Sequence, residues 1–69
     1  MYVFDFVRQE REKLGLTKQQ LADKAKVSLY VVKRIEANKP YNPSALKISK
    51  VAKAIGFDWD YLNDHCLWP

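Results

Sequence analysis

The chain has 69 residues, enough for one domain with a single hydrophobic core, and its 48% hydrophobic content with two glycines and three prolines excludes a disordered or low-complexity segment. Cys66 is the only cysteine and His65 the only histidine, which excludes a disulfide framework and a Cys/His metal cluster, so we expect no cofactor. The net charge is +4. No apolar run approaches the ~18 residues of a membrane span, and no basic leader opens the chain, so we expect a cytoplasmic protein.

The first predicted element is an amphipathic helix near the start of the chain. Val3, Val7 and Leu14 recur at intervals of four and seven residues, which places them on one helical face. Gly15 follows directly, in the position just past a helix end that glycine prefers.

A second and a third helix are predicted between residues 17 and 36. Thr17 and Gln20 have the spacing of a capping box, and Ser28 is the next good N-cap. No glycine or proline separates the two stretches, which favours one continuous helix, whereas Ser28 and the flanking apolar spacing favour a turn at Lys26 and Val27. The residues expected to face inward from this pair are Leu21, Ala22, Ala25, Val27, Val32 and Ile35.

Two more helices follow a loop that contains Pro40 and Pro43. Ser44 caps the fourth helix, which ends at Gly56, and Asp58 caps a short fifth helix with Trp59 and Leu62. The inward face of the fourth helix is expected to hold Leu46, Ile48, Val51, Ala52 and Ile55, and its outer stripe Lys47, Lys50 and Lys53.

The positive charge is concentrated in the middle of the chain. Residues 13–53 carry ten lysines and arginines against two acidic residues, whereas both flanks are weakly acidic. A basic middle of this kind indicates a site for a polyanion such as nucleic acid. Solvated lysines that serve only solubility explain the charge equally well at this stage.

The second and third helices have the lengths and the short connection of a helix-turn-helix, whose second helix can enter the DNA major groove. The segments REKLGLTKQQLADKA, VSLYVVKRIEANK and PSALKISKVAKAIGFD, within residues 7 to 60, resemble the lambda-repressor-like helix-turn-helix proteins of Cro and repressor type, the XRE family. The resemblance implies an all-α, compact five-helix bundle over residues 1–69, with the helix-turn-helix at about 18–37. It also implies binding to operator DNA, commonly as a dimer.

The resemblance assigns a structural ion pair to Arg11 of the first helix and Glu36 at the end of the recognition helix. The sequence differs from the family pattern at one position of the turn, where Lys26 replaces the usual glycine. A residue other than glycine at positive φ costs on the order of 1 kcal/mol, so Lys26 either bears this strain or adopts a different turn. The core positions that the resemblance implies are Leu14, Leu16, Leu21, Val32, Ile35, Leu46, Val51 and Ile55.

Residues that would touch DNA follow from this assignment. Arg34 is the best candidate base reader, because its planar fork matches guanine O6 and N7. Tyr30 and Leu29 can meet thymine methyl groups or can instead pack on neighbouring side chains. The expected base contacts are Ser28, Leu29, Tyr30, Lys33 and Arg34. The expected phosphate contacts are Lys18, Asn38, Lys39, Tyr41, Asn42 and Lys47, with Lys50 and Lys53 facing away from the duplex.

The sequence leaves two functions open. The first is a small DNA-binding transcriptional regulator, of the bare single-domain kind expected of phages and mobile elements. The second is a protein-interaction module of the same fold that modulates another regulator through the apolar edge formed by Leu29, Tyr30 and Val31. An enzyme is not expected, because no acid–base or nucleophile constellation is present in the sequence.

Aromatic residues gather at the two ends of the chain, which a helix bundle usually brings together. One interpretation is an aromatic cluster that seals the fifth helix onto the first, and the other is the face of a homodimer. The residues concerned are Phe4, Phe6, Trp59, Tyr61 and Trp68.

Overall fold

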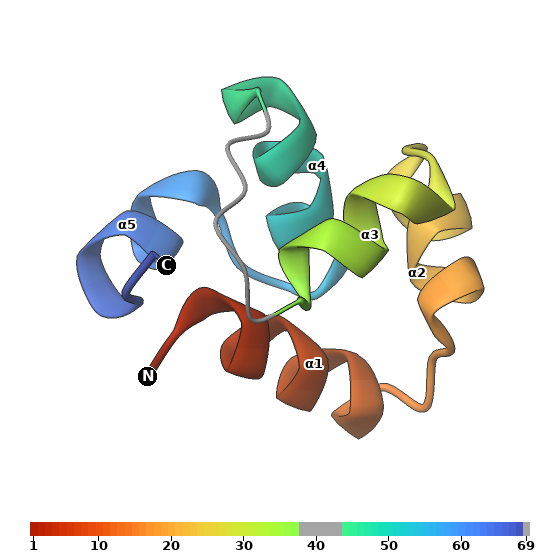
Figure 1. The fold of residues 1–69 in the computed structure, drawn as a ribbon, viewed down its shortest axis with the longest axis horizontal. Coiled ribbons are helices and arrows are strands. Elements are labelled where there is room, and N and C mark those ends of the chain that lie inside the picture. The colour runs from red at the N-terminus through yellow and green to blue at the C-terminus, as the bar shows by residue number, and fades with distance from the viewer. Residues whose placement is uncertain (38–43, 69) are drawn as a thin grey trace.

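The three-dimensional structure is a computed structural model that describes residues 1–37 and 44–68. Within these residues the chain forms five helices and no strand, and one isolated bridge joins Tyr2 to Leu67. The all-α, five-helix prediction is confirmed. The helices are α1 (Val3–Lys13), α2 (Lys18–Ala25), α3 (Leu29–Ile35), α4 (Ala45–Ala54) and α5 (Trp59–His65) (Figure 1).

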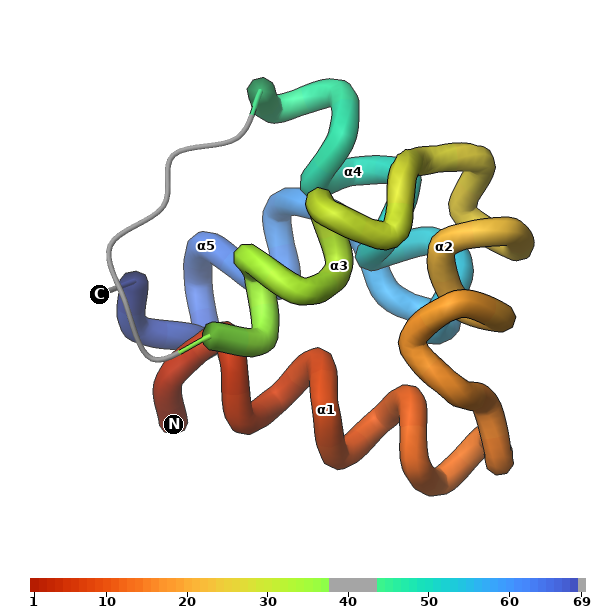
Figure 2. Tube along the Cα trace, turned by 45° about the vertical axis from the view of Figure 1, so that its right-hand side comes forward, coloured from red at the N-terminus to blue at the C-terminus, as the bar shows by residue number. Residues whose placement is uncertain are grey.

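The helices pack around α2 and α4. α2 contacts both α3 and α4, α5 contacts α4, and α1 contacts α3. Both ends of the chain lie on the same side of the molecule, beside α5 (Figure 2). The N–H of Val3 donates to the carbonyl of Leu67 at 2.9 Å, and the N–H of Leu67 donates to the carbonyl of Met1 at 3.0 Å. No helix within the described ranges is long and apolar enough to cross a membrane.

Side chains at the starts of the helices use the predicted caps, with one exception. The Thr17 hydroxyl accepts from the N–H of Gln20 at 3.1 Å, while the Gln20 side chain accepts from the N–H of Thr17 at 2.8 Å, which completes the capping box. The Ser44 hydroxyl caps α4 by accepting from the N–H of Lys47 at 3.3 Å, and the Asp58 carboxylate caps α5 by accepting from the N–H of Tyr61 at 2.8 Å. Ser28 occupies the N-cap position of α3, but its hydroxyl accepts no cap hydrogen bond.

Three helices end in one geometry, in which a left-handed residue reverses the chain. At the end of α2 the N–H of Lys26 donates to Asp23 and the N–H of Val27 donates to Ala22, which is the Schellman motif. The equivalent positions after α1 and α4 are Gly15, with φ of +70°, and Gly56, with φ of +91°. Lys26 adopts φ of +59° and ψ of +43° without the freedom of a glycine. The predicted turn between α2 and α3 is confirmed, and of the two alternatives for Lys26 the left-handed conformation is the one observed.

Replacing Lys26 with glycine is therefore expected to raise the free energy of unfolding by about 0.5–1 kcal/mol, because relief of the left-handed strain exceeds the added chain entropy. Urea denaturation followed by circular dichroism measures the change. Gly15→Ala is the matched control, since a Cβ there meets no atom within 4 Å and its effect reports the backbone alone. The free energy of unfolding of the Gly15→Ala variant should fall by a similar amount. Lower stability of Lys26→Gly would contradict the strain argument.

The core lies where the five helices meet. The described residues that are buried are Val3, Val7, Leu21, Ala22, Ala25, Val31, Val32, Ile35, Ile48, Val51, Ala52, Ala54, Ile55, Leu62 and Cys66. Burial raises the pKa of the Cys66 thiol above its ordinary value, although the N-terminal ammonium acts in the opposite direction. Cys66 therefore serves as a small apolar core residue rather than as a reactive thiol.

The prediction of a core position is wrong for two residues. Leu14 is 49% exposed and Leu46 is 65% exposed. Leu14 follows the last residue of α1, beyond which the Gly15 turn reverses the chain and Leu16 packs against the core instead. Leu46 lies two residues before Ile48, which is about 200° around the helix, so it faces away when Ile48 faces inward.

Aromatic residues from the two ends of the chain form the predicted cluster that packs α5 against α1. The ring of Phe6 lies 4.9 Å from Phe57 and 5.7 Å from Tyr61, between ring centres. Trp59 and Trp68 make a second pair at 5.8 Å. Phe4 does not join either group, since its ring stacks on Tyr2 at 5.2 Å.

Candidate nucleic-acid interface

The outer side of α3 is fixed in place because its inner side is buried against the bundle. Val31, Val32 and Ile35 are at most 4% exposed, and they attach the helix to the core. The prediction that Val31 belongs to an exposed apolar edge is wrong. In a seven-residue helix the neighbours Val31 and Val32 both fall within the face covered by the other helices, so the edge reduces to Tyr30 and part of Leu29.

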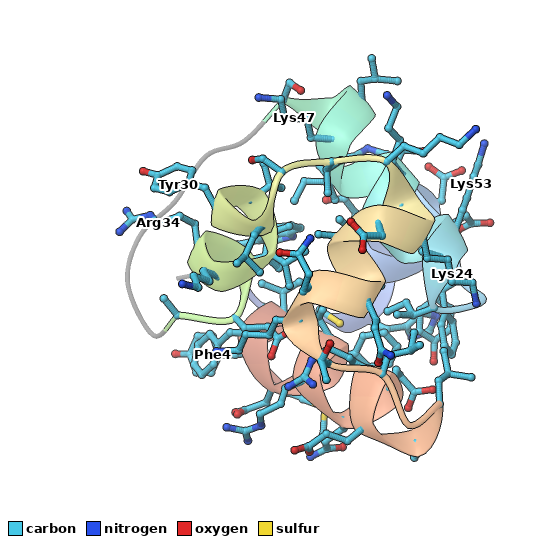
Figure 3. The ribbon with its side chains drawn as sticks, turned by 90° about the vertical axis from the view of Figure 1, so that its right-hand side faces the viewer. Phe4, Lys24, Tyr30, Arg34, Lys47 and Lys53 are labelled. Carbon is cyan, nitrogen blue, oxygen red and sulfur yellow. The ribbon has the colours of Figure 1, made fainter. Side chains whose placement is uncertain are left out.

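The opposite side of α3 carries polar and aromatic groups. Ser28, Tyr30 and Lys33 are exposed, and Leu29 and Arg34 are half-buried. Tyr30 is 62% exposed, and Arg34 lies one helical turn further along on the same side (Figure 3). Figure 3 also shows Lys47 of α4 on this side of the molecule. The arrangement presents a phenol and a guanidinium together, with a lysine from a second helix beside them.

Arg11 and Glu36 hold the end of α3 against α1. The Nε of Arg11 donates to Oε2 of Glu36 at 2.9 Å and its Nη2 donates to Oε1 at 3.1 Å, so the pair is bidentate. The remaining Nη1 donates to the carbonyl of Leu16 at 2.7 Å, just before α2 begins. The side chains are 11% and 2% exposed. One guanidinium therefore ties together α1, the entry to α2 and the end of α3.

The model of the helix-turn-helix family (HTH_3) matches residues 7–62 of the sequence. The chain belongs to the helix-turn-helix family. Among solved structures, a chain of the SinR protein/SinI protein complex is similar, with a TM-score of 0.79 and 28% sequence identity. That similarity covers 91% of this chain and 61% of the other, so the chain spans less than two thirds of that relative's length. Comparison with curated proteins gives no match.

The predicted phosphate contacts of this helix-turn-helix domain come from three places. Lys18 is the first residue of α2, and Lys47 lies in the first turn of α4. Both side chains are exposed, and both stand at helix starts, where backbone N–H groups lack intrahelical acceptors. The remaining four predicted contacts fall outside the described residues, and they are Asn38, Lys39, Tyr41 and Asn42.

A second basic surface lies away from α3, and its existence was not predicted from the sequence. Lys53 lies on the opposite side of the molecule from Tyr30 and Arg34, and Lys24 of α2 lies there beside it (Figure 3). The outward stripe of α4 indicated where Lys53 would point. No sequence pattern indicated that the end of α2 would contribute to the same surface.

Proposed function

We propose that the chain is a sequence-specific DNA-binding transcriptional regulator that reads operator DNA by placing α3 in the major groove. The observation that carries the proposal is the helix-turn-helix itself, whose buried inner side leaves Tyr30, Lys33 and Arg34 toward the outside. Family membership over residues 7–62 supports it. In this proposal residues 1–69 act as one domain, and occupancy of the operator blocks or adjusts access by the polymerase.

The residues divide into two roles under this proposal. Arg34 reads a guanine through two parallel hydrogen bonds, and Tyr30 meets a thymine methyl group or a phosphate. Phosphate contacts set the register of the protein on the duplex without reading its sequence. The base-contact set is Ser28, Leu29, Tyr30, Lys33 and Arg34, and the phosphate-contact set is Lys18, Asn38, Lys39, Tyr41, Asn42 and Lys47.

Selection of bound duplexes from a random pool tests the proposal directly. A recovered consensus supports sequence-specific binding, and the absence of any enriched duplex would refute it. A palindromic consensus would in addition support a dimer, because the symmetry of an operator mirrors that of the bound protein.

Salt dependence provides a separate test of the phosphate contacts. If about five phosphates are neutralised, the logarithm of the binding constant should fall with log salt at a slope near −4.5. Lys18→Ala should reduce the slope by about one and weaken all duplexes to a similar degree. Fluorescence anisotropy over a salt series measures both quantities. A nearly flat salt dependence of the unchanged protein would count against DNA as the ligand.

A homodimer is part of the same proposal, with the joined ends of the chain as its interface. Phe6, Tyr61 and their neighbours already contact one another within the protein, which leaves less aromatic surface for a partner. Among the described residues at this end, the large apolar side chains still exposed are Met1, Tyr2, Tyr61 and Leu67, at 57%, 44%, 37% and 58%. Sedimentation over micromolar concentrations decides the question, and a monomer at every concentration would exclude this interface.

A second candidate function is a protein-interaction module that binds and modulates another regulator. The exposed ring of Tyr30 favours it, because aromatic residues on a surface are typical anchors of protein interfaces. The similar solved structure is itself a complex of the SinR protein with the SinI protein, which is consistent with a protein partner. Binding that depends on Tyr30 and Leu29 but not on salt would favour this function over DNA binding.

A further inference from the structure

A hollow of about 350 Å³ lies between the end of α2 and the C-terminal half of α4. Figure 3 shows two of its lining residues, Lys24 and Lys53, on the side of the molecule opposite Tyr30 and Arg34. The hollow extends from this side of the molecule to Lys26, which lies two residues before Ser28 at the start of α3. Its lining consists of Lys24, Ala25, Lys26, Lys50, Lys53 and Ala54.

The charge around the hollow is of one sign. Four of its six lining residues are exposed lysines and none is acidic. The ion pairs among the described residues use Arg8, Arg11 and Lys13, and none uses a lysine of the hollow. Gathered ammonium groups repel one another, so an anionic occupant would be favoured there.

Helix dipoles account for only part of this arrangement. Lys24 and Lys53 lie in the last turns of α2 and α4, where a cation is stabilised by the helix C-terminus. Lys50 lies one turn earlier in α4. Lys26 is the residue that occupies the left-handed position where the other two Schellman turns have glycine. A strained lysine at the rim of a lysine-lined hollow is the kind of backbone outlier from which a function can be inferred.

The floor of the hollow is apolar, which distinguishes it from a plain phosphate site. Ala25 and Ala54 are 5% and 8% exposed, and each lysine adds a four-carbon stem below its ammonium group. Carboxylates on either side of an apolar side chain would match both the rim and the floor. A nucleic-acid backbone offers phosphates to the rim but no apolar group to the floor. The volume is near the lower end for ligand sites, which suits one short segment.

We propose that this hollow binds an acidic segment of a partner protein, in which an apolar side chain is flanked by carboxylates. The apolar side chain rests on Ala25 and Ala54, and the carboxylates pair with Lys24, Lys26, Lys50 and Lys53. Lys24 and Lys53 lie opposite Tyr30 and Arg34, so a partner held by these two lysines leaves Tyr30 and Arg34 accessible. The proposal goes beyond the function proposed above and does not depend on it.

A fluorescein-labelled peptide with a central leucine between two glutamates on each side tests the proposal by anisotropy. The unchanged protein is expected to bind it saturably, and Lys50→Ala combined with Lys53→Ala should weaken binding about tenfold. Lys18→Ala combined with Lys47→Ala removes the same charge elsewhere and should leave peptide binding within about twofold. Circular dichroism verifies that both variants are folded, as expected for exposed lysines.

Two further measurements separate the alternatives. A peptide with serine in place of leucine should bind more weakly, and Lys26→Gly should also weaken the leucine peptide. Absence of saturable binding, equal loss in the two double variants, or equal binding of the serine peptide would overturn the proposal. If Lys50→Ala with Lys53→Ala instead lowers affinity for a DNA duplex, the hollow belongs to nucleic acid. If the chain binds no duplex, the proposed DNA-binding function of α3 fails, but the proposal that the hollow binds an acidic segment is still decided by the peptide measurements.

Discussion

Replacing Arg11 with alanine is expected to lower the free energy of unfolding by about 3–5 kcal/mol. The substitution removes both hydrogen bonds to Glu36 and leaves that carboxylate, 2% exposed, without its counter-charge. It also removes the donor to the carbonyl of Leu16. A chain of 69 residues has a total stability of about 3–10 kcal/mol, so this loss is a large fraction of the total. Urea denaturation and thermal melting measure the loss.

Two controls show whether buried charge is the cause. Arg8→Ala breaks an ion pair with Asp5 whose side chains are 49% and 35% exposed, and it should cost less than about 1 kcal/mol. Arg11→Met combined with Glu36→Leu removes both charges and keeps the volume, so it should be more stable than Arg11→Ala alone. A loss below about 1 kcal/mol for Arg11→Ala would mean that the pair is solvated and that packing alone holds α3.

Local signals in the sequence were enough to predict the five helices. Caps and left-handed helix ends act over five or six residues, so Thr17, Ser44, Asp58 and Gly56 marked boundaries that the structure confirms. The turn after α2 was predictable despite its missing glycine, because a cap and a change in apolar spacing stood on either side of it. The pairing of Arg11 with Glu36, 25 residues apart, came only from the family resemblance.

The errors occurred where an apolar residue was assigned to a face without knowledge of its neighbours. Leu14 lies just past the last residue of α1, where the spacing is helical but the core does not extend, and Leu46 lies on the side of α4 that faces away from the core. Val31 was assigned to the outside as part of an apolar edge, yet the helices around α3 cover it. The lysine-lined hollow joins residues 24–26 to residues 50–54, and only the packing of α2 against α4 brings them together.

Replacing Arg34 with alanine is expected to weaken binding to the selected duplex by about 1–3 kcal/mol, which is a loss of roughly 5- to 150-fold. The loss should be largest for the preferred sequence and smaller for random duplex, because a base contact contributes to discrimination whereas a phosphate contact does not. Anisotropy with the selected duplex and with a scrambled duplex of equal length measures the two affinities. A circular-dichroism melt of the variant separates loss of contact from loss of folding.

Arg34→Lys is the control that separates base reading from charge. Lysine keeps the positive charge but has no planar fork, so the variant should retain affinity for random duplex and lose most of the discrimination. Equal discrimination by the lysine variant would show that Arg34 acts only through its charge. Tyr30→Ala completes the comparison, because its ring is the most exposed apolar group on α3. If that variant lost binding to a protein partner while every Arg34 variant bound DNA unchanged, α3 would be a protein-binding helix on a DNA-binding fold.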